Sequence, residues 1–191
     1  MSKNKVKFGL KNVHVWPITS GNADEVIYGE VIKVPGAVEM SLDPSGDSME
    51  FYADDIVYFA EFANNGYEGD LQIALIPEEF ELEILGYEKD KNGAIVEKVD
   101  GRGKNYAMAF EFDGDVEKTR HIFYNVSSSR PGVAGKTKEE TKEPSTDTLS
   151  LKAMPSRDSG IVKAKINQSQ KAVYDDFFTT PYIPVSTDSM E

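Results

Sequence analysis

Apolar and polar residues alternate along most of the chain, in short runs separated by Gly, Pro, Asn and Asp. Alternation with a period of two is typical of strands that turn one face toward a core. Many short strands and one or two short helices predict a mainly β protein: a β-sandwich or partly closed barrel with a helix docked on its flank. The predicted strand segments are residues 5–18, 26–34, 38–42, 71–75, 106–112, 122–126, 149–153 and 161–166.

One helix is predicted over residues 77–85. Pro77 suits the first turn of a helix, and Gly86 is a good residue just after its end. A helix of about nine residues is marginal alone in water, so it must pack on the sheet. The residues spaced to form its docking face are Ile76, Phe80 and Ile84.

Between the strands near residues 42 and 71 lies a segment with an excess of aromatic and acidic residues. Residues 43–47 are predicted to form a loop or turn, and residues 51–80 a strand, a turn, a second strand and a helix, with Asn65-Gly66 as a strong hairpin-turn signal. Aromatic residues of this kind are enriched at interfaces. The segment either folds back on its own sheet or reaches a partner. Its candidate contact residues are Asp43, Asp47, Phe51, Tyr52, Asp54, Asp55, Tyr58 and Phe59.

Length and composition bound the remaining possibilities. A chain of 191 residues is expected to hold one domain, residues 1–178, followed by an extended and weakly packed extension over 179–191. The formal charge of −12 argues against a protein that wraps nucleic acid. Cysteine is absent, and we expect neither a signal peptide nor a membrane span, hence a soluble protein made in the cytoplasm.

Catalytic motifs are not recognisable. His14 and His121 lie within strand patterns, and neither a nucleophile elbow nor a phosphate-binding loop is present. Residues 43–47 resemble the start of a calcium loop, but Ser48 replaces the turn glycine and Asp54 replaces the bidentate glutamate. We therefore expect no enzyme, no cofactor and no bound metal.

Several short segments together resemble one family. They are Phe8-Gly-Leu-Lys-Asn-Val13, Pro35-Gly-Ala-Val38, Phe51-Tyr-Ala-Asp-Asp55, Asn64-Asn-Gly-Tyr67, Gly69-Asp70-Leu71, Ala74-Leu-Ile-Pro77, Phe110-Glu-Phe-Asp-Gly-Asp115, Arg120-His121 and Gly135-Lys-Thr-Lys-Glu-Glu140. Over roughly residues 5–165, the chain with these segments is similar to the major tail protein of long-tailed, non-contractile phages or prophages, in the phi13-type group.

The resemblance implies a tail tube protein of the virion, made in the bacterial cytoplasm. Such a protein forms homohexameric rings that stack around a tape-measure protein, and it also meets the tail terminator and distal tail proteins. DNA passes through the lumen without specific binding, and no membrane is involved. A long loop of the family reaches neighbouring rings, and the matching segment here is residues 43–64.

A lumen that DNA traverses must not bind it, because each Lys or Arg that meets a phosphate adds affinity. We therefore expect acidic residues to face the lumen, the alternative for each being a solvated outer face. The candidates, polar positions on strands near the helix, are Glu39, Glu50, Glu61, Glu68 and Asp70.

A second function, from a different class, is a monomeric β-sandwich module that binds a glycan or protein on a host surface. It requires exposed aromatic residues that form a concave platform. Phe51, Tyr52, Tyr58 and Phe59 are the residues that supply one. Self-assembly of the purified protein favours the tube, and glycan binding without assembly favours the module.

Overall fold

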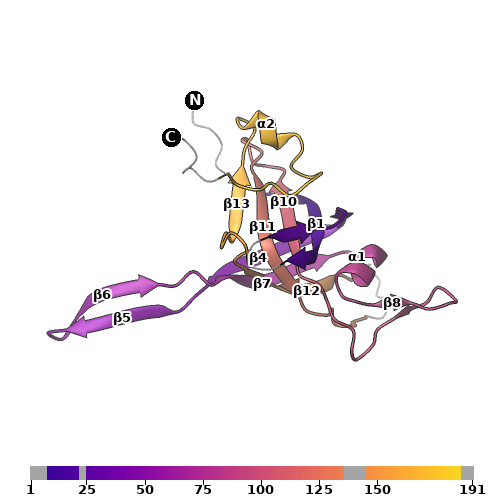
Figure 1. Ribbon diagram of the computed structural model, residues 1–191, viewed down its shortest axis with the longest axis horizontal. Coiled ribbons are helices and arrows are strands. Elements are labelled where there is room, and N and C mark those ends of the chain that lie inside the picture. Colours follow the sequence, from indigo (N-terminus) through magenta and orange to yellow (C-terminus); the bar gives the residue numbers. More distant parts are fainter. Residues whose placement is uncertain (1–7, 22–24, 136–144, 186–191) are drawn as a thin grey trace, which may run out of the picture.

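A computed structural model describes residues 8–21, 25–135 and 145–185 (Figure 1). Strands make up 47% of it and helices 6%, which confirms the mainly β prediction. In chain order, the elements are β1 (Leu10–Gly21), β2 (Val26–Tyr28), β3 (Ile32–Lys33), β4 (Ala37–Ser45), β5 (Ser48–Ala53), β6 (Ile56–Phe62), β7 (Gly66–Ile73), α1 (Glu78–Glu83), β8 (Glu88–Lys89), β9 (Ile95–Val96), β10 (Tyr106–Phe112), β11 (Arg120–Ser128), β12 (Asp147–Met154), β13 (Lys163–Ile166) and α2 (Lys171–Tyr174).

Nine of the described strands form one large antiparallel sheet. Its order is β2-β1-β10-β11-β12-β7-β4, with β3 beside β1 and β13 beside β11. The amide of Val34 donates to the carbonyl of Val13 at 2.9 Å, so the chain just before β4 returns to β1 and the sheet curls. Within the described ranges β4 pairs only with β7, and no closed barrel forms.

The main core lies between the two halves of the curled sheet. Alternation along the strands sends Leu71 and Ile73 of β7, and Leu149 and Leu151 of β12, into it. From β10, Met108 points to the same core. The outward-facing residues of β7 and β12 are polar, as the period of two predicts.

β10 and β11 also bury their opposite face. Ala107, Ala109, Ile122 and Tyr124 form a second core there with Trp16 of β1. Residues of the C-terminal segment cover it; the packed side chains are Tyr174, Phe177, Phe178 and Tyr182. The central strands of the sheet are therefore enclosed from both sides.

α1 docks on the main core and lies within the predicted range 77–85. Its N-cap is Pro77, and Gly86, with φ of +76°, lets the chain turn away after the last turn. The Phe80 ring meets Tyr106 edge to face at 5.7 Å between centroids. The three predicted docking residues, Ile76, Phe80 and Ile84, are all buried in this core.

The expectation of a weakly packed extension from residue 179 does not hold for its first residues. Trp16 Nε1–H donates to the carbonyl of Thr179 at 3.4 Å, and the Tyr124 hydroxyl donates to that of Tyr182 at 2.7 Å. The physical reason is the second core, whose apolar face needs a cover. Residues 186–191 lie outside the described ranges.

The hairpin turn predicted at Asn65-Gly66 is wrong. β6 pairs with β5, and the turn that joins them is Asp54-Asp55, with φ of 51° and 59°. Gly66 is instead the first residue of β7, at a point where the β7 backbone lies close to that of β12. A Cβ at Gly66 would lie 1.9 Å from the carbonyl oxygen of Ala153, so only glycine fits.

Residues 43–47, predicted as a loop or turn, belong in part to a strand, and the segment that the resemblance matches to a long loop, residues 43–64, is largely strand. β4 continues through Pro44 to Ser45, which is possible because β4 is an edge strand and a proline there breaks no ladder. The rest of the segment is the β5–β6 hairpin. Two smaller differences are that residues 26–34 divide into β2 and β3, and that Leu75 lies beyond β7 and is exposed.

Candidate assembly surfaces

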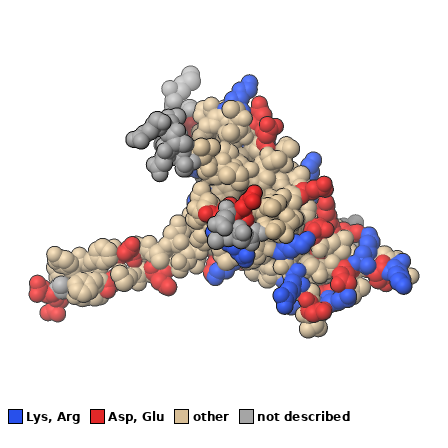
Figure 2. Space-filling view, in the orientation of Figure 1, with Lys and Arg blue, Asp and Glu red and all other residues tan. Residues whose placement is uncertain are grey.

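The β5–β6 hairpin, residues 48–62, projects away from the body of the molecule (Figure 1). We call it the arm. It forms its own two-stranded sheet, separate from the large one. In the space-filling view its surface is neutral and acidic, without a visible basic side chain (Figure 2).

The arm exposes eight large hydrophobic side chains. Tyr58 and Phe62 are 75% and 78% exposed, and the least exposed, Phe59, is still 48% exposed. Contiguous apolar surface of this kind on a soluble protein marks an interaction site. The eight residues are Met49, Phe51, Tyr52, Ile56, Val57, Tyr58, Phe59 and Phe62.

The pairing register sorts these side chains onto two faces. Phe51 lies opposite Phe59 and Tyr52 opposite Val57, and directly opposed residues share a face. Phe51 and Tyr52 are successive residues of β5 and point to opposite faces, whereas a register shift at this point interrupts the alternation along β6. The Tyr52 hydroxyl donates to the Glu50 carboxylate at 2.6 Å, as expected for residues two apart on one strand. We refer to the Phe51 face and the Tyr52 face of the arm.

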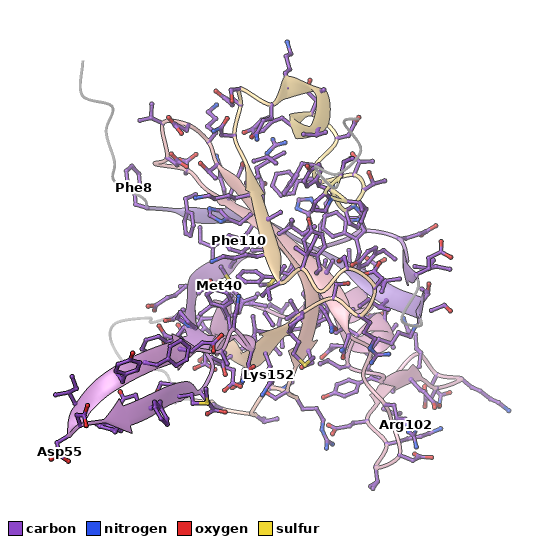
Figure 3. The ribbon with its side chains drawn as sticks, turned by 60° about the vertical axis from the view of Figure 1, so that its left-hand side comes forward. Phe8, Met40, Asp55, Arg102, Phe110 and Lys152 are labelled. Carbon is purple, nitrogen blue, oxygen red and sulfur yellow. The ribbon has the colours of Figure 1, made fainter. Side chains whose placement is uncertain are left out.

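The acidic candidates of the predicted loop are spread along the arm and its base. Asp54 and Asp55 form its tip (Figure 3), Asp47 lies at its base, and Asp43 belongs to β4 of the body. From residue 34 to residue 88 the sequence holds 14 Asp and Glu and no Lys or Arg. The arm therefore lies within a strongly acidic stretch of the chain.

A second surface is the outer face of β4, β7 and β12. Three of the five lumen candidates, Glu39, Glu68 and Asp70, lie on it, together with Asp43. The register aligns them in rows across the three strands, and we call this surface the acidic face. Two such rows are Asp43–Glu68–Lys152 and Ser41–Asp70–Ser150.

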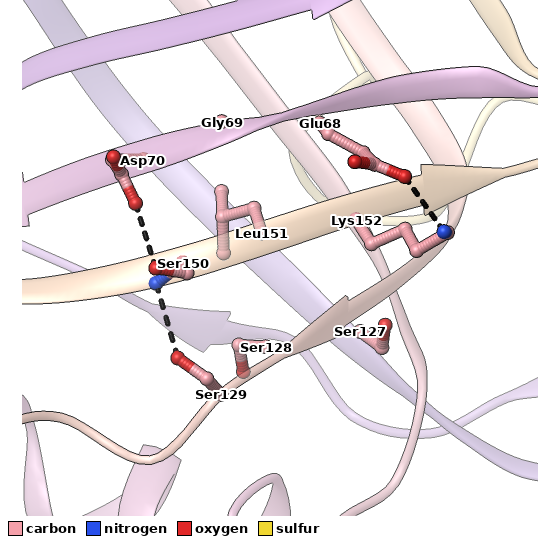
Figure 4. A pocket seen from close by; sticks show the side chains of 9 residues that line it. All are labelled: Glu68, Gly69, Asp70, Ser127, Ser128, Ser129, Ser150, Leu151 and Lys152. Atoms are coloured by element: carbon pink, nitrogen blue, oxygen red, sulfur yellow. Dashed lines mark hydrogen bonds and ion pairs between the residues drawn. The ribbon is translucent and has the colours of Figure 1, made fainter. Parts of the chain in front are cut away.

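Hydrogen bonds and one ion pair hold the acidic face in place (Figure 4). Lys152 Nζ lies 2.6 Å from a Glu68 carboxylate oxygen, and this contact lowers the pKa of Glu68. The Ser150 hydroxyl donates to Asp70 at 2.8 Å, and the Ser150 amide donates to the Ser129 hydroxyl at 3.3 Å. Beside them lies an open hollow of about 480 Å³.

The remaining lumen candidates lie elsewhere. Glu50 and Glu61 belong to the arm, Glu50 opposite Ala60 on the Tyr52 face and Glu61 opposite Met49 on the Phe51 face. The structure thus divides the five predicted acids between two surfaces. The sequence pattern alone had grouped them because all are polar strand residues near α1.

Sequence reasoning missed a buried ionic cluster that joins β10 to β11. Arg120 Nε lies 3.1 Å from Glu111, and both side chains are largely buried. Asn12 of β1 donates to Glu111 at 2.6 Å, while the Arg120 guanidinium lies 3.7 Å from the centre of the Tyr174 ring and donates to the Tyr174 carbonyl. The sequence feature that could have revealed this pair is the turn at residues 113–115. A turn there pairs the two flanking strands and places Glu111 opposite Arg120.

The two histidines belong to packed surroundings. His14 Nδ1–H donates to the carbonyl of Asn12 at 2.8 Å, and its ring stacks on Phe178 at 4.7 Å. Partial burial lowers the pKa of His14. His121 stacks on Phe110 at 5.3 Å. Within the described ranges, no three or more His, Cys, Asp or Glu side chains gather in a way that suits a metal ion.

The two short helices in the described part of the chain lack the length and apolar character needed to cross a membrane. The sequence matches no known family model, and a search of curated proteins finds no similar sequence.

Proposed function

We propose that this chain is a structural virion protein: a tail tube subunit of a long-tailed, non-contractile phage. Copies assemble into homohexameric rings, and the rings stack around a tape-measure protein into a tube through which DNA passes. The tube ends at the tail terminator and distal tail proteins. The observation that carries this proposal is the arm, with eight exposed hydrophobic side chains on a projecting hairpin.

The energetics of the arm favour a multivalent assembly. Burying its exposed apolar area supplies on the order of 10 kcal/mol, at roughly 1.5–3 kcal/mol for each fully buried side chain. Association of two proteins costs an estimated 4–15 kcal/mol. A single arm contact is therefore marginal, whereas a ring that engages several arms at once gains strongly from effective concentration.

The sheet edges support ring formation. β4 pairs on one side only among the described residues, and β2 and β3 lie at the other end of the sheet. Unpaired strand edges are templates for pairing with another chain, and a closed ring of such contacts removes them. A heterologous contact that closes makes a ring, and one that repeats along an axis makes a tube.

The acidic face suits the wall of a lumen that carries DNA. Glu39, Asp43, Glu68 and Asp70 are exposed on it, and Lys152 is paired with Glu68. In the two rows described above, no unpaired Lys or Arg is available to bind a DNA phosphate. Low affinity for DNA is what a conducting tube needs.

Electron microscopy of the purified protein tests the proposal. Wild-type protein, alone or with its tape-measure protein, should form rings or tubes across a range of concentrations. The matched control is a variant with Phe51→Ser and Tyr58→Ser, which should stay monomeric. Wild-type protein that stays monomeric under all these conditions contradicts the proposal.

The exposed aromatic side chains of the arm also suit a second candidate function, that of a monomeric binding module. The register, however, places Phe51 and Phe59 on one face and Tyr52 on the other. A hairpin of this kind presents two narrow apolar faces and no concave platform. Glycan-array binding by a protein that remains monomeric in light scattering would replace the tube proposal with this one.

A further inference from the structure

A half-enclosed pocket lies among the loops at one end of the large sheet, and none of its lining residues belongs to the arm or to the acidic face. Its volume is about 280 Å³, which suits a small ligand. The walls come from the last residues of β1, the loop at residues 103–105, Asn125 of β11 and the loop at residues 156–157. Segments far apart in the sequence thus converge on one hollow.

Two asparagine side chains fix the polar groups of this pocket. Asn125 is 5% exposed, and its Nδ2–H donates to the carbonyl of Pro155 at 3.0 Å. Because a carbonyl can only accept, the Asn125 amide is oriented, and its Oδ1 accepts from Asn105 Nδ2 at 2.7 Å. Asn105 therefore has its own Oδ1 left over. In the part of the chain that the structure describes, no donor forms a hydrogen bond to that oxygen.

The pocket also carries positive charge. Arg157 and Lys104 are among the described residues that line it, and no Asp or Glu is. Lys104 pairs with Glu83 at 2.9 Å, but an ammonium has three donors and keeps two of them. Asp158, the neighbour of Arg157, already accepts a hydrogen bond from the Ser156 hydroxyl at 2.6 Å. In a protein with a net charge of −12, this lining favours an anion.

The charge of the ligand follows from the number of cations. A phosphate monoester carries close to two negative charges at neutral pH, whereas a carboxylate carries one. Two cations without an acid beside them match the phosphate better. The unused Asn105 oxygen, in contrast, requires a hydrogen-bond donor, which a hydroxyl group supplies.

We propose that this pocket binds a small phosphate ester that also carries a hydroxyl group, that is, a phosphorylated polyol. Arg157 and Lys104 hold the phosphate, and the planar guanidinium matches its oxygens with two parallel hydrogen bonds. Asn105 Oδ1 accepts a hydrogen bond from the hydroxyl, while Ile18 and Val26 contact the carbon skeleton. The inference does not depend on tube assembly.

Isothermal titration calorimetry of the unassembled chain with glycerol 3-phosphate tests this site. Glycerol, glycerate and inorganic phosphate are titrated separately. The protein should bind glycerol 3-phosphate more tightly than glycerate or inorganic phosphate, and should not bind glycerol. This ranking is expected because only the full ligand satisfies both the cations and the Asn105 oxygen.

Three variants locate the binding. Arg157→Gln should weaken binding of glycerol 3-phosphate at least about tenfold, through loss of a charge-assisted bidentate contact. Ser20→Glu adds an acid to the lining and should weaken it similarly. The matched control is Arg102→Gln, which removes an exposed arginine outside the pocket and should bind as the wild type does (Figure 3). All three side chains are exposed, so the melting temperature should not change.

The possible results separate the parts of the proposal. Inorganic phosphate or glycerate that binds as tightly as glycerol 3-phosphate overturns the assignment of a phosphorylated polyol. Equal losses in Arg157→Gln and Arg102→Gln, or no binding of glycerol 3-phosphate at millimolar concentration, overturn the site itself. A chain that binds glycerol 3-phosphate as expected but never forms rings or tubes supports the site and contradicts only the proposed function.

Discussion

At the scale of single residues, His14 gives a prediction about pH. Its pKa is lowered, chiefly by desolvation on partial burial, with Lys33 and Arg120 acting in the same direction and Glu111 and the Asn12 carbonyl opposing them. Between the lowered folded pKa and the unfolded value of about 6.5, the unfolded state binds more protons. His14 therefore contributes stability above about pH 6.5, and this contribution is lost as the pH falls through the folded pKa.

The His14→Gln variant tests this assignment. Its melting temperature should fall less than that of the wild type between pH 7.5 and pH 5, because the titrating ring is gone. His121 is present in both proteins and serves as an internal control. Equal falls in the two proteins would show that His14 is not responsible.

A second residue-scale prediction concerns Gly69 in the middle of β7. A Cβ at this position would lie 1.9 Å from the carbonyl oxygen of Ser41 on β4. Gly69→Ala must therefore push β4 away from β7, and we expect a loss of about 1–3 kcal/mol in unfolding free energy. Gly132→Ala is the matched control, because no atom lies near its Cβ position. Urea unfolding of the two variants compares them.

At the scale of elements, the Glu111–Arg120 pair fastens β10 to β11 and to the C-terminal segment. Arg120→Met leaves the buried Glu111 carboxylate without its cation, which should cost about 3–5 kcal/mol. The double variant Glu111→Leu, Arg120→Met removes both charges and should recover most of that loss. Denaturant unfolding of both variants measures the difference. A double variant no more stable than the single one contradicts the ionic assignment.

We expect the arm to contribute to assembly and little to folding. Phe51→Ser together with Tyr58→Ser should leave the melting temperature nearly unchanged while preventing assembly, because both side chains are exposed. The contrast is Phe80→Ser in α1, whose ring is buried and whose truncation should cost about 3–5 kcal/mol. Calorimetry and light scattering on the same samples separate these effects. A clearly lower melting temperature for the arm variant would show that Phe51 and Tyr58 belong to the folded core.

At the scale of the whole molecule, one stretch of the chain differs in charge from the rest. The stretch from residue 34 to residue 88 supplies β4, the arm, β7 and α1, and it is acidic throughout. The remainder is close to neutral. The acids of the acidic face and of the arm therefore all come from this one stretch of the sequence.

The acidic face gives a prediction about DNA. Assembled particles with Glu39, Glu68 and Asp70 changed to Lys should sediment with DNA at low salt and release it at high salt, through counterion release. Wild-type particles should leave DNA in the supernatant. The matched control changes Glu79, Asp175 and Asp176 to Lys, an equal charge reversal away from the acidic face. Equal DNA binding by both variants would mean that the acidic face has no special exposure to DNA.

The sequence by itself determined the local elements. The period of two marked the strands later seen as β7, β10 and β12, because alternation along an extended chain decides which side chains share a face. Pro77 and Gly86 bounded α1 through the conformations that proline and glycine allow. The density of aromatic and acidic residues singled out the segment that forms the arm, although not its hairpin structure.

Only the tertiary structure decided how these elements meet. Asn65-Gly66 has the chemistry of a turn, yet the glycine serves the close crossing of β7 and β12, and the turn falls at Asp54-Asp55. The division of the acids between the arm and the acidic face likewise follows from the register of β4 with β7. Pairing and register depend on contacts between residues far apart in the chain, and local pattern carries no information about which distant partner a strand will find.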